Sequence, residues 1–133
     1  MINEVLDSLV GIGITPQKVS PNILRFEKEG LNFVFQGDLA DDPSYYRLML
    51  PDIDSDLDDM PSVYEKAVQI SSSYKVGKCI VIEGKVWLTV EGFAYDAKSV
   101  TFLVARLINV LKDMINAYRE YGTGKDESGQ KEY

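Results

Sequence analysis

The sequence predicts an α+β fold in which a five-stranded antiparallel sheet packs against helices, the longest of which lies at the C-terminal end. The first observation is the segment 96–121, whose apolar side chains recur every three or four residues over about five turns, as in a helix with one buried stripe. The second is a set of five short segments that alternate apolar and polar residues or are continuously apolar. The third is the dipeptide Glu-Gly, which joins two pairs of these segments and favours tight hairpins.

The N-terminal part begins with a predicted helix. Residues 3–10 carry apolar side chains at helical spacing, and the two glycines that follow suit a helix end. Pro16 and Pro21 bracket the next stretch, which we interpret as a connecting loop. Two strands, 22–28 and 31–36, then form the first predicted hairpin.

The middle of the chain is predicted to hold a third strand and a second helix. Residues 45–50 alternate, and Pro51 suits the end of a strand or a place near an edge. A polar, negative loop is expected to follow. The second helix is predicted over residues 61–73, because Pro61 suits a first helical turn.

Two more strands and the long helix complete the predicted order, which is α-β-β-β-α-β-β-α. Residues 79–82 are apolar on both faces, as in a central strand, and residues 85–93 alternate. We expect the first and last helices to cover one face of the sheet. The second helix is expected at an edge or on the other face.

Length and composition indicate one domain. Residues 1–121 of the 133 carry the patterned segments, whereas residues 122–133 have no apolar pattern and are predicted to be disordered. No apolar run approaches the roughly 20 residues that cross a bilayer, and the N-terminal residues lack the basic start of a secretory signal. The single cysteine excludes an internal disulfide. We therefore predict a cytoplasmic protein.

The charge is concentrated in one part of the chain. The net charge is −7, and the stretch from Asp38 to Asp59 holds eight acidic residues and one basic residue, so that the remainder is balanced. This pattern argues against nucleic-acid binding and against docking on an anionic membrane surface. Histidine is absent from the sequence, which excludes Ser–His–Asp and Cys–His catalysis and metal sites built on imidazole.

The sharpest local feature is an acidic patch before the second helix, formed by Asp52, Asp54, Asp56, Asp58 and Asp59. Alternate aspartates are typical of calcium-binding loops, but the sixth position counted from Asp52 is leucine instead of glycine and the twelfth is valine instead of glutamate. We interpret the patch as a solvated loop and predict no bound metal. The glycines at 11–13 and 122–124 lack the other positions of nucleotide-binding motifs, so no cofactor is predicted either.

Two single residues each allow a functional and a structural interpretation. Cys79 is flanked by apolar residues, which favours a buried, inert thiol over a nucleophile or a redox sensor. Trp87 falls on the polar side of its predicted strand, so it is either an exposed anchor for a partner or a ring covered by Tyr64 or Tyr74.

The element order, the short first helix, the two Glu-Gly hairpins and the long last helix resemble the type III secretion chaperone-like fold, in particular its YbjN-like branch, over residues 1–121. The resemblance implies a homodimer that binds segments of partner proteins. It also implies dimer contacts on the second helix and the strand after it. The predicted partner or dimer surface is made of Tyr64, Val68, Cys79, Val81 and Trp87.

Three functions follow as hypotheses. The first is a non-enzymatic protein-binding or chaperone-like module that works as a homodimer. The second is a small-ligand binder or a carboxylate-based enzyme with a pocket between the sheet and the long helix, although no two acidic residues fall at inward strand positions. In the third, the acidic loop itself contacts a basic partner.

Overall fold

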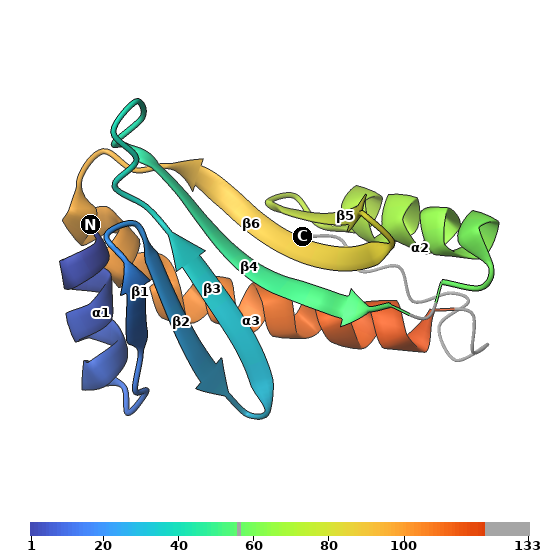
Figure 1. The fold of residues 1–133 in the computed structure, drawn as a ribbon, viewed down its shortest axis with the longest axis horizontal. Helices are drawn as coiled ribbons and strands as arrows, with labels where there is room; N and C mark the ends of the chain where they lie inside the picture. The colour runs from blue at the N-terminus through green and yellow to red at the C-terminus, as the bar shows by residue number, and fades with distance from the viewer. Residues whose placement is uncertain (56, 122–133) are drawn as a thin grey trace.

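The computed structural model describes residues 1–55 and 57–121, and Figure 1 shows their arrangement. In chain order the elements are α1 (Ile2–Gly11), β1 (Gln17–Ser20), β2 (Ile23–Lys28), β3 (Leu31–Gln36), β4 (Tyr45–Asp54), α2 (Met60–Ser73), β5 (Gly77–Ile82), β6 (Lys85–Phe93) and α3 (Ala97–Glu120). The predicted α+β class and the long C-terminal helix are confirmed. The predicted disorder of residues 122–133 lies outside the described residues.

The sheet has six strands in the order β1-β2-β3-β4-β6-β5, and every neighbouring pair is antiparallel. The predicted count of five strands and the predicted element order are therefore wrong by one strand. The additional strand, β1, lies between Pro16 and Pro21, where a loop was predicted. Its first three side chains are exposed, so it has no alternating pattern, and only its backbone pairing with β2 defines it.

Both predicted hairpins are confirmed. Glu29 and Gly30 connect β2 to β3, and Glu83 and Gly84 connect β5 to β6. All four residues have positive φ, between 50° and 79°. Two consecutive positive φ values belong to the two-residue turn whose twist matches that of the paired strands. The glycine in each pair adopts this conformation without a steric cost from a side chain.

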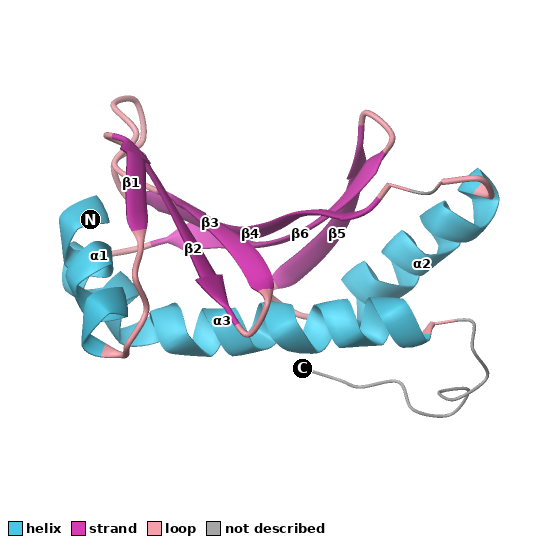
Figure 2. Ribbon diagram, turned by 60° about the horizontal axis from the view of Figure 1, so that its bottom comes forward, coloured by secondary structure: helices cyan, strands magenta, loops and turns pink. Residues whose placement is uncertain are grey.

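The helices all lie on one side of the sheet, and the opposite side is uncovered and concave (Figure 2). α3 runs beneath the sheet, α1 lies beside the N-terminal end of α3, and α2 lies along β5 near the C-terminal end of α3. The expectation that α1 and α3 share a face is confirmed, and α2 lies at the edge strand β5. Among the described residues, none of the helices combines the length and the apolar character that crossing a membrane requires.

The core lies between the sheet and α3, where the alternation of the strands predicts it. The inward residues of β2, β3, β4 and β6 are buried, and they pack with the apolar stripe of α3. These inward residues are Leu24, Phe26, Phe33, Phe35, Tyr46, Leu48, Leu50, Val86, Leu88 and Val90, and Cys79 of β5 joins them. α3 begins after Asp96, whose carboxylate accepts a hydrogen bond from the Ser99 backbone N–H at 2.9 Å.

Candidate functional site: the open face of the sheet

The side of the sheet that faces away from the helices carries the main candidate site, which we call the open face. Its side chains come from alternate residues of β2 to β6, on the surface opposite the core. They are Ile23, Arg25, Glu27, Asn32, Val34, Gln36, Tyr45, Arg47, Met49, Lys78, Ile80, Ile82, Lys85, Trp87, Thr89, Glu91 and Phe93.

The centre of the open face is apolar. Val34, Met49 and Thr89 lie side by side on β3, β4 and β6. Met49 is only 6% exposed and Thr89 only 3%, although no helix covers them. Neighbouring side chains and the curvature of the sheet must therefore exclude water there. Trp87 and Ile80, paired between β6 and β5, are half-buried beside this centre.

A charged cluster adjoins the apolar centre. Arg47 and Glu91 are paired across β4 and β6, and Arg47 Nε lies 3.4 Å from Glu91 Oε2. Lys78 Nζ on β5 lies 2.9 Å from the other carboxylate oxygen, Oε1. The Tyr45 hydroxyl also donates to Glu91 and accepts from Arg47 Nε at 2.9 Å. One carboxylate is thus shared by two cations and a phenol.

These contacts alter the protonation of the cluster. The hydrogen bond from Tyr45 and the ion pair with Lys78 together hold the pKa of Glu91 below its usual range. The same ion pair raises the pKa of Lys78. Burial, together with the hydrogen bond to Glu91, raises the pKa of the Tyr45 phenol. Around neutral pH the cluster therefore carries two positive charges, one negative charge and a neutral phenol.

Trp87 lies on the open face, as the alternation of β6 indicates. The stacked and edge-to-face ring pairs of the described residues do not include it. Tyr74 is buried on the helix side, where its hydroxyl donates to Asp113 of α3 at 3.0 Å, so it does not cover Trp87. The indole Nε1 is buried and has no hydrogen-bond partner among the described residues. A buried donor without a partner destabilises the folded state. The indole N–H is therefore free to donate a hydrogen bond that no described residue accepts.

Both edges of the sheet are protected against strand addition. β1 has only four residues, lies between two prolines and includes Lys18, features that discourage pairing at an edge. On β5, the Ser71 hydroxyl of α2 accepts from the Cys79 N–H at 2.9 Å and donates to the Cys79 carbonyl at 3.2 Å. The outward backbone groups of Cys79 are thus already bonded. A partner is accordingly more readily received on the open face than at an edge.

The predicted surface of Tyr64, Val68, Cys79, Val81 and Trp87 is not one continuous surface. Tyr64 and Val68 are 55% and 66% exposed on the outer side of α2, and Val81 is half-buried on β5. Cys79 is 5% exposed and lies in the core, so its side chain is not available at the surface of the protein. Burial raises the pKa of its thiol to about 12, which agrees with the inert interpretation.

The acidic patch is not a single loop. Asp52 and Asp54 belong to β4, which is longer than predicted, and of the aspartates that the structure describes, Asp58 and Asp59 lie in the connection to α2. Asp56 lies outside the described residues. Asp54 accepts a hydrogen bond from the Tyr118 hydroxyl of α3, and Asp59 caps α2 by accepting from the Ser62 N–H. At least two of the aspartates thus have structural roles. No group of three or more potential metal ligands occurs within 1–55 and 57–121.

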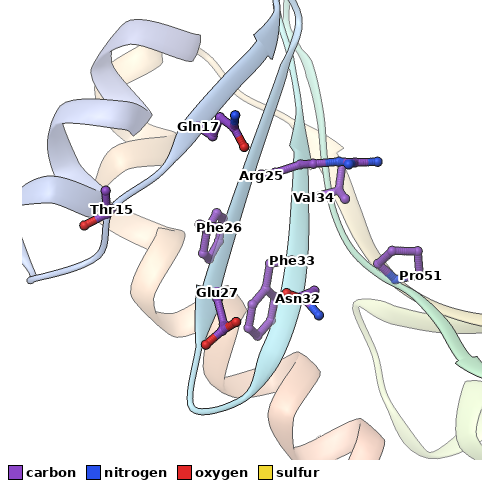
Figure 3. Close-up of a pocket in the computed structure, with 9 residues that line it drawn as sticks. All are labelled: Thr15, Gln17, Arg25, Phe26, Glu27, Asn32, Phe33, Val34 and Pro51. Carbon is purple, nitrogen blue, oxygen red and sulfur yellow. The ribbon is translucent and has the colours of Figure 1, made fainter.

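A pocket of about 460 Å³ lies at the far end of the β2–β3 hairpin, not between the sheet and α3. Figure 3 shows Arg25, Val34 and Pro51 on one side of the two strands and Phe26 and Phe33 on the other. Thr15, Gln17, Glu27 and Asn32 complete the lining. Its size is within the range of small-molecule sites, and Glu27 is the one carboxylate that lines it.

The open-face residues Tyr45, Arg47, Met49 and Glu91 are not predicted as a group from the sequence. The signal that points to them is the presence of apolar residues at outward strand positions, because Val34 and Met49 fall on the side where polar residues are usual. No protein-family model matches the sequence, and no curated protein matches it. The resemblance to the type III secretion chaperone-like fold therefore stays a prediction.

Proposed function

We propose that the protein is a non-enzymatic binding module of the cytoplasm that holds a segment of a partner protein on the open face of its sheet. The observation that carries the proposal is the group of half-buried apolar side chains in and beside the apolar centre, Val34, Ile80 and Trp87, over which no helix lies. Apolar surface with polar neighbours is typical of binding sites. The chaperone-like resemblance supports the same class of partner.

A selection from a random peptide library tests this function. The immobilised wild type is expected to retain a defined set of peptides, and Val34→Glu is expected to lose them, because the substitution puts a charge in the apolar centre. Phe102→Glu is the matched control: it makes the same kind of change at a position that is 88% exposed on α3, on the helix side. Thermal unfolding establishes that both variants are folded. Equal retention by the wild type and Val34→Glu, or loss in Phe102→Glu alone, contradicts the proposal.

The homodimer is a second proposal, supported by a different surface. Tyr64 and Val68 are one turn apart and expose apolar side chains on the outer side of α2. A two-fold contact would place this surface against its own copy. Light scattering after size exclusion tests it. Wild type is expected as a dimer at tens of micromolar, a range typical of weak complexes, and Val68→Glu as a monomer. A monomeric wild type contradicts the dimer.

A small-ligand function is the remaining candidate, and the pocket at the β2–β3 hairpin supports it. Gln17, Arg25 and Asn32 supply polar groups to its lining, and Val34 and Pro51 supply apolar groups on the same side of the strands as Arg25, as a site for a small molecule with polar and apolar parts requires. Fragment screening by protein NMR tests it. Shifts confined to β1, β2 and β3 are expected for a ligand. Shifts that cluster elsewhere, or that do not saturate, contradict it.

A further inference from the structure

We infer that the partner segment bound on the open face carries an acidic residue between two apolar residues. The inference rests on the proposed function, since it describes what the proposed site recognises. The charge of the face, the spacing of its apolar groups and the partial burial of its ion pairs carry it, and each is independent of the resemblance.

The open face is opposite in sign to the protein as a whole. The chain has a net charge of −7, whereas the open face holds four basic residues (Arg25, Arg47, Lys78, Lys85) and two acidic ones (Glu27, Glu91). Lys85 is paired at the margin with Asp52, at 3.8 Å. Even when Asp52 is counted, the face remains positive. An acidic segment would therefore be attracted here and repelled by most of the remaining surface.

The surplus positive charge has a definite position. Arg47 and Lys78 both bind Glu91, so the cluster has one more cation than carboxylate. The Tyr45 hydroxyl also donates a hydrogen bond to Glu91. Because this hydroxyl is neutral, the excess of one positive charge in the cluster is unchanged. A second carboxylate, supplied by a partner, would balance the cluster.

Apolar groups lie on both sides of this cluster along the strands. Two residues beyond the Arg47–Glu91 pair, Tyr45 and Phe93 form an edge-to-face pair with ring centroids 5.8 Å apart. In the other direction, the buried Met49 and Thr89 are flanked by half-buried apolar side chains, which are Val34, Ile80 and Trp87. Two strand residues span about 7 Å. An extended segment with a carboxylate over the cluster would therefore direct one flanking apolar side chain toward the Tyr45–Phe93 pair, about 7 Å away, and the other toward Val34, Ile80 and Trp87.

Partial burial makes this charge contact selective. The side chains of Arg47 and Glu91 are 36% and 26% exposed, so ions in solution screen them less than they screen fully exposed pairs. A neutral peptide would leave the surplus cation partly desolvated, and a basic peptide would add repulsion. The site is thus expected to prefer acidic segments to neutral ones, and neutral segments to basic ones.

The peptide selection described above also tests this inference. Two results are compared with it: the composition of the retained peptides, and the effect of reversing a charge on the protein and on the peptide. Wild type is expected to enrich peptides with Asp or Glu between two apolar residues. Synthetic peptides with the enriched sequences but without tryptophan are then titrated into the protein. Their binding is followed by the fluorescence of Trp87, the one tryptophan of the chain. Lys78→Glu is expected to weaken their binding about tenfold, the effect of reversing one partly screened charge. The same variant is expected to bind copies with Lys in place of the acidic residue more tightly than wild type does. Arg106→Glu, the same charge change on the outer side of α3, should bind as wild type does.

The outcomes separate the two proposals. If the enriched peptides are neutral or basic, yet are lost in Val34→Glu, the acidic preference is wrong and the binding face stands. If no peptide is enriched, or if Val34→Glu retains all of them, both are wrong. Lys78→Gln, at a side chain that is 61% exposed, provides a milder variant should Lys78→Glu fail to fold. Binding of acidic peptides that is unchanged in both Lys78 variants overturns the inference.

Discussion

The hydroxyl of Tyr118, near the end of α3, donates a hydrogen bond at 2.8 Å to the carboxylate of Asp54, the last residue of β4. Tyr118 is buried, and the ammonium of Lys66 on α2 lies 5.0 Å from the centroid of its ring. Burial, together with the bond to Asp54, raises the pKa of Tyr118, so the hydroxyl stays a donor at every physiological pH. This single side chain therefore joins α3 to β4 and α2.

Tyr118→Phe is expected to lower the free energy of unfolding by about 1–3 kcal/mol, because it removes a partly buried hydrogen bond to a charged group and leaves the packing of the ring in place. Urea denaturation measures the loss. Tyr121→Phe is the matched control, since its hydroxyl bonds Glu65 at the surface and its removal should change stability little. Equal effects of the two substitutions would show that the Tyr118 bond has no special role.

Ser71 protects the edge of β5 through its two hydrogen bonds with the backbone of Cys79. Ser71→Ala is expected to destabilise the protein by about 1–3 kcal/mol, because it leaves a backbone donor and acceptor unpaired. It is also expected to increase self-association at high concentration, since an unprotected strand edge pairs with other chains. Urea denaturation and light scattering measure the two effects. Ser72→Ala, which removes only a bond to the Val68 carbonyl on the exposed side of α2, should leave both unchanged.

Local patterns predicted the core of this fold but not its additional strand. The alternation in β6 predicted that Val86, Leu88 and Val90 face the helices, because a strand with one buried face must place apolar residues at every second position. β1 gave no such signal, since an edge strand with exposed side chains is held by backbone pairing alone. The extension of β4 was missed for a related reason. A tertiary contact with Tyr118 favours an aspartate at a strand end where local propensity disfavours it.

The open face was not predictable from local patterns because it depends on the order of the strands. β4 and β6 are neighbours in the sheet, although α2 and β5 lie between them in the chain. Arg47 and Glu91 meet only through this non-sequential pairing. The sequence shows that Trp87 is on the polar side of its strand. It does not show which side chains of other strands surround it.

Gly77 allows α3 to approach the start of β5 closely. A Cβ atom at this position would lie 2.3 Å from the sulfur of Met114, which is fully buried on α3. Gly77→Ala is therefore expected to lower the free energy of unfolding by about 1–3 kcal/mol through overpacking. Adding Met114→Val, which shortens the obstructing side chain, should reduce the cost of the alanine, as a double-mutant cycle would show. Gly11→Ala, where a Cβ meets nothing within 4 Å, is the control. Additive effects of the two substitutions would contradict the clash.

The buried thiol of Cys79 makes stability depend on pH in the alkaline range. Its pKa is raised by burial from 9.0 to about 12, so between these values the unfolded chain loses the thiol proton while the native protein retains it. The free energy of unfolding should then fall as pH rises above 9, by up to about 1.4 kcal/mol per pH unit from this group. Tyrosines contribute in the same range, so the comparison is with Cys79→Ala, which keeps them and removes the thiol. The variant is expected to start less stable, because it leaves a small cavity, but to lose stability less steeply between pH 9 and pH 10.5 in urea denaturation series. Parallel curves for the two proteins would show that the native thiol ionises as readily as the unfolded one, and hence that Cys79 is not sealed from water by Ser71 and the core.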